Sequence, residues 1–113
     1  MFKYLTKTAA GYDGKVSSKV DCQGQAKIFA ALSDPVRLRI VQQLSGGESR
    51  SGSALAEQLG ISLALLCHHT RILLEAGLIT KKKEGQTAFF TIQRDVLTGC
   101  MENLLKSAAS GKD

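Results

Sequence analysis

The sequence predicts a small, mainly helical domain that carries one β-hairpin. Most of the chain repeats apolar residues every three or four positions, which is the spacing of an amphipathic helix. One stretch near the C-terminus instead alternates residues in period two on either side of Glu84-Gly85-Gln86, which is typical of two strands and a tight turn. The length of 113 residues fits a single domain.

Residues 1–19 are expected to form an N-terminal arm, partly disordered, because they mix glycines and lysines and show no periodic apolar face. Helical spacing begins near Asp21. Asp34-Pro35 then starts a second helix, since aspartate is a good N-cap and proline suits the first helical position. Gly46-Gly47 ends this second helix. The expected inward-facing residues of the first helix are Cys22, Ala26, Phe29 and Leu32, and those of the second are Val36, Ile40, Val41 and Leu44.

A short helix over residues 51–59 and a longer helix over residues 63–76 are separated by a tight turn at Gly60. Ser62 is the expected N-cap of the longer helix, and Gly77 is its expected C-terminal stop. Apolar residues at the crossing of these two helices are expected to form a small core. They are Leu55, Ala56, Leu59, Ile61 and Leu66.

The stretch after Gly77 predicts a β-hairpin, and one face of its second strand is expected to be buried because residues 88, 90 and 92 alternate with residues 87, 89 and 91. A last helix is expected from about Arg94, with apolar residues at helical spacing as far as Ala108. The folded domain is therefore expected to span residues 20–108. Residues 109–113 are expected to form a C-terminal tail.

Two short helices joined by a tight turn and followed by a hairpin are the parts of a winged helix-turn-helix. The predicted fold class is thus mainly α with a β-hairpin wing. In this arrangement the N-terminal half of the second helix, here residues 63–76, meets base edges in the major groove of DNA. The wing supplies cations to the phosphate backbone.

Several stretches of the chain resemble the ArsR/SmtB family of bacterial winged-helix repressors. They are ALSDPVRLRIVQQL, LAEQLGIS and CHHTRILLEAGLITKKKEGQTAFFTI, together with the closing helix. The resemblance covers roughly residues 24–106. It implies a homodimer built from the first and last helices, which binds a pseudo-palindromic operator and releases it when an inducer or an oxidant acts.

The expected DNA-binding surface joins the start of the longer helix to the wing. We favour a DNA-facing role over simple solvation for His68 and Arg71. A run of lysines is usually only solvated, but on a wing that follows a recognition helix it favours phosphate contact. The residues assigned to this surface are Ser62, Leu63, Ala64, Cys67, His68, Arg71, Lys81, Lys82, Lys83 and Gln86.

The start of this helix departs from the family pattern, in which several Ser, Gln or Thr side chains contact DNA. Leu63, Ala64 and Leu65 replace those polar groups here. Two interpretations stay open: the apolar side chains contact thymine methyl groups, or they make operator recognition weak or unusual. Cys67 also stands where serine is usual, Thr70 where leucine is usual, and Gln86 replaces a common wing arginine.

The Cys-His-His triplet at residues 67–69 is not expected to bind a metal ion. Consecutive helical residues point about 100° apart, so three in a row do not converge on one ion. No carboxylate is placed by the sequence to make either histidine a general base. We expect a structural role for His69, facing the first helix of the helix-turn-helix.

The two inducer sites that are best known in the family are a cysteine pair on the first helix of the helix-turn-helix and a zinc-type site on the last helix that opens with Asp-x-His. Here the helix over residues 51–59 contains no cysteine. The last helix contains no histidine, and Leu97 stands in the place of the expected one, so neither site is expected in this chain.

Cys22 and Cys100 are the remaining candidates for sensing, because each falls on the apolar stripe of a helix expected at the dimer interface. They either pack as small hydrophobic residues or act as a thiol switch. A switch would form a disulfide or polysulfide, or bind a thiophilic ion such as arsenite. Cys67 is a separate case, because it is expected on the DNA face. Oxidation there would weaken DNA binding directly. The simpler interpretation is that Cys67 makes a serine-sized contact and has no sensing role.

The composition limits the other classes of function. The formal net charge of +5 favours an anionic partner such as nucleic acid. No apolar run approaches the roughly 18 residues of a membrane span, and the N-terminus lacks a secretion signal, so a cytoplasmic location is expected. The sequence shows no nucleophile–base pair and no phosphate-binding glycine loop, so we do not expect an enzyme. The alternative functions are a thiol- or metal-handling protein whose DNA-binding surface has decayed, and a repressor with no cysteine-based sensing.

Overall fold

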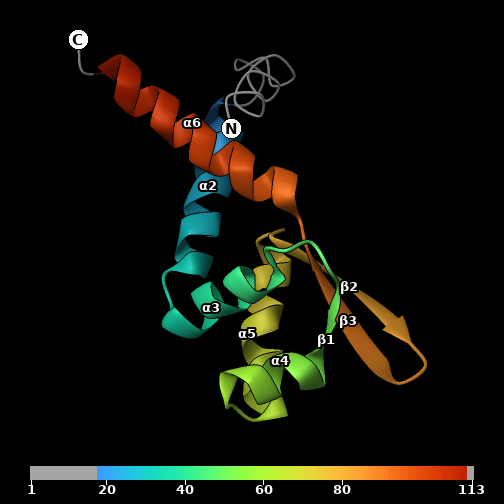
Figure 1. Ribbon diagram of the computed structural model, residues 1–113. Coiled ribbons are helices and arrows are strands. Elements are labelled where there is room, and N and C mark those ends of the chain that lie inside the picture. The colour runs from blue at the N-terminus through green and yellow to red at the C-terminus, as the bar shows by residue number, and fades with distance from the viewer. Residues whose placement is uncertain (1–17, 112–113) are drawn as a thin grey trace.

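The computed structural model describes residues 18–111, and among them the side chains of residues 22–109. The expected arm, as far as residue 17, and residues 112–113 of the expected tail lie outside this range. Figure 1 shows the elements along the chain. They are α2 (Ser18–Leu32), α3 (Pro35–Leu44), β1 (Arg50–Ser51), α4 (Gly52–Leu59), α5 (Leu63–Glu75), β2 (Ile79–Glu84), β3 (Thr87–Ile92) and α6 (Arg94–Gly111).

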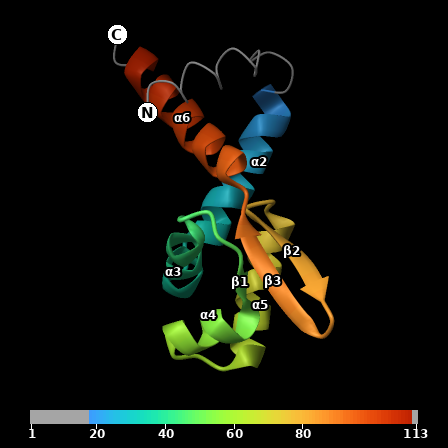
Figure 2. The same ribbon diagram turned by 45° about the vertical axis from the view of Figure 1, so that its right-hand side comes forward.

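The helices and strands divide into two ends of the molecule. α3, α4, α5 and the sheet pack together at one end, whereas α2 and α6 cross at the other (Figures 1 and 2). α2 links the two ends, because it contacts α3 and α5 as well as α6. The β2–β3 hairpin extends beside α5, and the predicted wing is therefore confirmed.

Polar side chains cap the helices where the sequence predicts them. The Asp34 carboxylate accepts hydrogen bonds from the backbone N–H groups of Val36 and Arg37, at 2.8 and 3.1 Å. The Ser62 hydroxyl accepts from the N–H of Leu65 at 3.0 Å. A cap of this kind contributes about 1 kcal/mol to stability. Gly60 ends α4 with φ of 69°, a left-handed conformation that fixes the tight turn before α5.

The sheet contains a short strand that the sequence does not predict. β1 pairs antiparallel with β3, and the strand order is β1-β3-β2. Arg50 lies opposite Phe90, and Ser51 lies opposite Phe89. A strand of two residues is too short to show an alternating sequence pattern. Its pairing is decided by β3 and by the chain that follows α3. β1 ties the start of α4 to the base of the wing.

The core lies between α3, α4, α5 and one face of the sheet. Phe90 and Ile92 are buried, which confirms the predicted inward face of β3. Leu55, Ala56, Leu59 and Leu66 are buried as predicted, and Ile61 is partly buried against them. The largest side chains that are almost completely buried are Ile40, Leu44, Leu55, Leu66, Leu73 and Leu78.

The predicted inward stripe of α2 is only partly correct. Ile28 and Ala31 are the α2 side chains that enter the core. Phe29 packs against the edge of that core, and Cys22 is exposed in the single chain. Because each turn of helix holds 3.6 residues, a shift of one residue rotates the buried face by about 100°. Cys100 on α6 is buried, as the sequence predicts.

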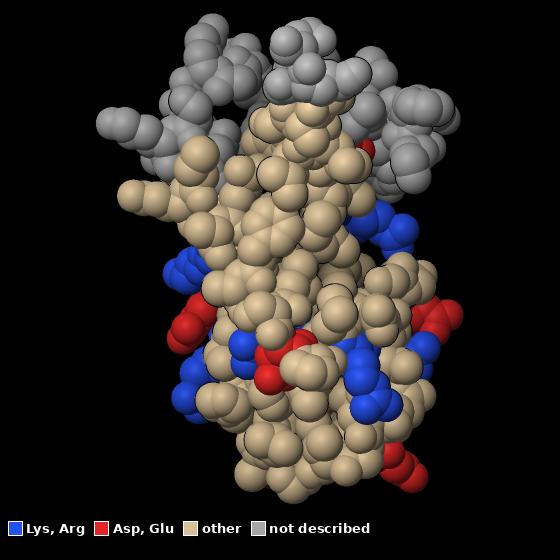
Figure 3. All heavy atoms as spheres, turned by 90° about the vertical axis from the view of Figure 1, so that its left-hand side faces the viewer, with Lys and Arg blue, Asp and Glu red and all other residues tan. Residues whose placement is uncertain are grey.

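Exposed leucines mark the end of the molecule formed by α2 and α6. Leu104 and Leu105 on α6 are 52% and 64% exposed. Figure 3 shows few charged side chains at the height of α2 and α6 on the face that it displays, and more of them lower down. Two leucines of α6 are therefore largely exposed at this end of the molecule.

Candidate nucleic-acid interface

α5 has one face in the core and the other in solvent. Leu66, His69, Thr70 and Leu73 are buried. These four residues follow the three-and-four spacing that the capped start at Ser62 imposes on the helix. The remaining side chains of the N-terminal half of α5 are exposed. They are Leu63, Ala64, Leu65, Cys67 and His68, and Arg71 follows them on the same outer surface.

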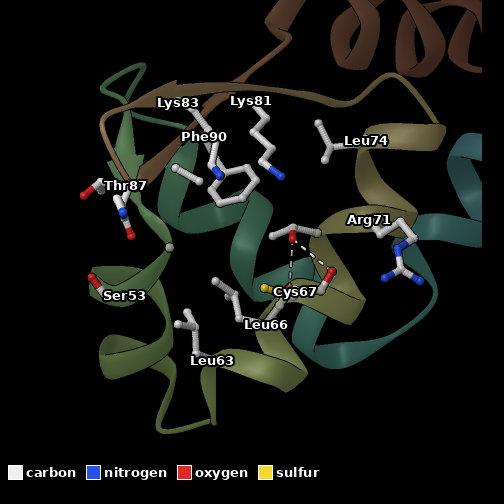
Figure 4. A pocket seen from close by; sticks show the side chains of 14 residues that line it. Ser53, Leu63, Leu66, Cys67, Arg71, Leu74, Lys81, Lys83, Thr87 and Phe90 are labelled. Carbon is white, nitrogen blue, oxygen red and sulfur yellow. Dashed lines mark hydrogen bonds between the residues drawn. The ribbon is translucent and has the colours of Figure 1, made fainter.

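An open groove of about 530 Å³ separates α5 from the wing (Figure 4). Leu66 and Phe90 line its inner part, together with Gly52 at the start of α4. A Cβ atom at Gly52 would lie 3.4 Å from side-chain atoms of both Leu66 and Phe90, so the small residue keeps the inner end open. Cys67 and Arg71 line the groove from α5.

Cationic side chains border the groove on both sides. Arg71 lines it from α5, and Lys81 and Lys83 line it from β2 (Figure 4). Lys82 lies between them in sequence and is not among the lining residues. Its ammonium is 4.0 Å from a carboxylate oxygen of Glu84. Successive residues of a strand point to opposite faces, so the lysine run splits into two side chains toward α5 and one away from it.

The structure brings together most of the residues that the sequence assigns to the DNA surface. Leu63, Cys67, Arg71, Lys81, Lys83 and Gln86 line one groove. Ser62, Ala64 and His68 are exposed on α5 or at its N-cap, but they are not among the residues that line the groove. Sequence reasoning missed Ser53 and Thr87, whose side chains also line the groove. An exposed hydroxyl at the start of the helix before α5 was the available signal for Ser53.

His69 is buried, but its polar contacts differ from the expectation that it faces the first helix of the helix-turn-helix. Its Nδ1 atom is 3.2 Å from a guanidinium nitrogen of Arg37 and 3.7 Å from a carboxylate oxygen of Asp34. Both partners belong to the start of α3 rather than to α4. Because arginine only donates, Nδ1 accepts this hydrogen bond and the proton of the neutral ring is on Nε2.

The same arginine reaches a second helix. Arg37 Nε donates a hydrogen bond to the backbone carbonyl of Ala31, in the last turn of α2, at 2.7 Å. Burial lowers the pKa of His69; the Asp34 carboxylate opposes this effect and the Arg37 charge reinforces it. His69 therefore favours the neutral form that accepts from Arg37.

The cysteines differ in exposure. Cys22 and Cys67 are exposed, and Cys100 is buried. Burial raises the pKa of the Cys100 thiol, which keeps it protonated near neutral pH. The Gln25 side chain, one turn after Cys22, donates a hydrogen bond of 3.4 Å to the Cys100 carbonyl and connects α2 to α6 at this level. Within the part of the chain that the structure describes, no three His, Cys, Asp or Glu side chains form a group that could hold a metal ion.

A recognition helix and a hairpin wing that frame one cationic groove define a winged helix-turn-helix of the DNA-binding class. The family described as helix-turn-helix domain matches residues 32–82. Transcriptional repressor SdpR of Bacillus subtilis is 32% identical over 84 residues, which cover 74% of this chain and 92% of that protein. Other relatives are regulators of arsenical, mercury and cadmium resistance in Bacillus subtilis, Streptomyces lividans and Staphylococcus aureus.

Solved structures show the same fold. An ArsR-like transcriptional regulator from Rhodococcus sp. RHA1 gives a TM-score of 0.69 at 29% identity, over 78% of this chain and 82% of that one. A homodimeric winged helix-turn-helix DNA-binding domain from Mycobacterium bovis gives 0.64 at 26% identity, over 86% of this chain and 89% of that one. The chain belongs to the ArsR family of winged helix-turn-helix transcriptional repressors. It is a DNA-binding regulator and not an enzyme.

Over the described residues, no helix is both long and apolar enough to cross a bilayer.

Proposed function

We propose that two copies of this chain form a repressor that binds a pseudo-palindromic operator and leaves it when a thiol-directed signal reaches Cys22 and Cys100. The observation that carries the proposal is the groove between α5 and the wing. It joins the exposed start of α5 to Arg71, Lys81 and Lys83 on a single surface. Such a surface suits a duplex, whose major groove accepts the helix while its phosphates meet the cations.

The dimer is proposed from the other end of the molecule. Leu104 and Leu105 are largely exposed on α6, and α2 lies against the same helix. Burying exposed leucines against a second copy is favourable by about 25 cal/mol per Å² of apolar surface. The homodimeric relative from Mycobacterium bovis supports the same assembly. A twofold dimer places two α5 helices for two half-sites, and this is why the operator is proposed to be palindromic.

The thiol signal is proposed from the two cysteines near the crossing of α2 and α6. Disulfide formation takes two protons and two electrons from two thiols, so it requires an oxidant such as a peroxide or a reactive sulfur species. Exposed Cys22 would react first, with a peroxide to form a sulfenic acid or with a polysulfide to form a persulfide. The Cys100 thiol would then attack the Cys22 sulfur, which forms the disulfide and releases water or hydrogen sulfide. Arsenite would instead exchange two hydroxyl groups for the two sulfurs and release water. The relatives in arsenical and mercury resistance support this second form.

The test is fluorescence anisotropy with duplex DNA from the promoter of this protein's own gene. Binding is measured in reductant, after disulfide-forming oxidation, and with arsenite in full reductant. We expect tight binding in reductant and release in at least one of the other two conditions. Cys22→Ser and Cys100→Ser should each abolish that release. Release that persists in both variants would leave these cysteines as packing residues only.

Cys67 needs its own control, because its exposed thiol lines the DNA groove. Oxidation there would obstruct the duplex without any change at α2 and α6. Cys67→Ser should keep the response to oxidant or arsenite if the signal acts through Cys22 and Cys100. A response that disappears only in Cys67→Ser would move the sensing site to the DNA surface.

A second candidate function is a thiol- or metal-handling protein whose DNA surface has decayed. The exposed leucines at the start of α5 favour it, since they replace side chains that usually hydrogen-bond to bases. Salt separates the two candidates. A repressor that contacts phosphates loses affinity steeply as salt is added, because binding releases counterions. A chain that binds thiophilic ions but no duplex at low salt would support the second candidate.

A further inference from the structure

The first turn of α5 presents an apolar surface at the place where a recognition helix meets base edges. Leu63 is 54% exposed and Leu65 is 42% exposed, with Ala64 exposed between them. None of these three side chains can donate or accept a hydrogen bond. The Ser62 hydroxyl just before them already accepts from the N–H of Leu65.

The surroundings of this turn are cationic. Arg71 lies two turns further along α5, and Lys81 and Lys83 line the same groove from β2 (Figure 4). This arrangement fits an occupant that is anionic at its edges and apolar at its centre. A DNA duplex has phosphates along both edges of its major groove, and it carries one apolar group on the groove floor, the C5-methyl of thymine.

Leu63 lies on the side of α5 that lines the groove. It lines the groove near Gly52, where a Cβ atom would lie 3.8 Å from Leu63 Cδ1, and Figure 4 shows it on the groove side of α5. Leu65 points about 200° further around the helix and is not among the lining residues. The two leucines are therefore similar in chemistry and exposure but different in direction.

We propose that the first turn of α5 reads thymine methyl groups in each operator half-site, with Leu63 as the main contact and Ala64 beside it. This inference rests on the proposed function, since it requires α5 to enter the major groove. Apolar side chains gain contact area on a thymine methyl. Over guanine or cytosine they would displace water from polar groups without replacing its hydrogen bonds, which is unfavourable. The half-sites are therefore expected to carry thymines opposite this turn.

The test begins with a duplex selected by this protein from a randomised library. Each thymine of the selected half-site is then replaced by deoxyuridine, which removes only the methyl group. Affinity is measured by fluorescence anisotropy at one salt concentration. At one or two positions we expect affinity to fall about fourfold for each methyl removed. Cytosine at those positions should bind worse, and 5-methylcytosine should recover part of the affinity.

Protein variants assign the effect to a side chain. In Leu63→Ala the ratio of thymine to uracil affinity should fall close to one at the sensitive position. Leu65→Ala is the matched control, and it should keep the ratio of the unchanged protein. Both side chains are largely exposed, so neither substitution opens a cavity in the core. A ratio that falls equally in both variants, or in neither, would overturn the assignment to Leu63.

Failure of this inference is distinguishable from failure of the proposed function. Duplex binding with a steep salt dependence and no effect of deoxyuridine at any position would overturn the methyl readout and leave the repressor intact. The absence of any duplex binding at low salt would overturn both.

Discussion

The inner and outer faces of α5 differ in the burial and the contacts of their side chains. On the inner face, Leu66 and Leu73 are buried and His69 bonds to Arg37. On the outer face, Leu63 and His68 are exposed, and Leu63 lines the groove. Two adjacent histidines thus have opposite environments on one helix. One face therefore specifies the fold and the other is available for binding. Substitutions on the inner face should change stability, and substitutions on the outer face should change DNA affinity.

The largest expected effect is on the inner face. Leu73→Ala removes a side chain that is fully buried and leaves a cavity, so it should lower the free energy of unfolding by about 2–5 kcal/mol. Urea unfolding followed by circular dichroism measures this. Leu63→Ala on the outer face is the matched control and should change stability by about 0.5 kcal/mol or less. Comparable destabilisation in the two variants would contradict the division into two faces.

The next effect concerns DNA affinity. Arg71→Ala or His68→Ala should weaken operator binding by about 1–3 kcal/mol if the side chain contacts a base, with unfolding unchanged. Anisotropy titrations and urea melts of the same samples separate the two quantities. Unchanged affinity in both variants would remove the outer face of α5 from the binding surface.

A smaller effect should divide the lysines of the wing. Lys81 and Lys83 line the groove, whereas Lys82 is close to Glu84. Removing one cation that binds a phosphate should reduce the slope of log affinity against log salt by about 0.9. In the dimer, Lys81→Ala with Lys83→Ala removes up to four such cations and should flatten the slope by about 3.6, whereas Lys82→Ala should leave it almost unchanged. Equal flattening in the single and double variants would show that β2 does not approach the duplex by one face.

The smallest expected effect is a pH dependence at His69. Its pKa is lowered from the ordinary value of 6.5, chiefly by burial. The unfolded chain then takes up the proton more readily than the folded chain. Stability should be unaffected well above pH 6.5, decline as the pH falls below it, and stop declining once the pH is below the folded pKa.

Urea midpoints at about pH 7.5 and about pH 5.5, on either side of the ordinary histidine pKa, measure this contribution. His69→Gln should reduce the difference between the two midpoints, because the titrating ring is gone. His68→Gln is the control on the exposed face and should reduce the difference less than His69→Gln does. A difference that is identical in all three proteins would mean that His69 does not titrate between these pH values.

The sequence predicts those parts of the fold that depend on local signals. Asp34-Pro35, Ser62, Gly60 and Gly77 fix where helices start and stop, and their caps form as expected. Features that depend on contacts between distant residues could not be predicted from the sequence. β1 exists because β3 offers it a partner, and Arg37 meets His69 across 32 positions of sequence. Neither contact leaves a pattern in a single sequence.

The candidate site divides in the same way. The sequence assigned all three lysines of the wing to the DNA surface, and the structure leaves Lys82 outside the groove that its two neighbours line. Helical spacing was sufficient to place Leu63 and Arg71 on the exposed surface of α5. The gathering of these side chains around one groove required the packing of the wing against α5. The exposure of Cys22 likewise follows from how α2 and α6 cross, which no local signal specifies, whereas the burial of Cys100 was predicted from the apolar stripe of α6.

Arg37 has a consequence for anyone who redesigns this protein. Its guanidinium bonds to the last turn of α2 and to His69 of α5 at the same time. Lysine keeps the charge but lacks the planar fork that can serve two acceptors in different directions. A chimera that imports a new recognition helix to change operator preference should therefore bring its own residue 37 with it. The exchangeable unit for engineering is α5 together with the start of α3.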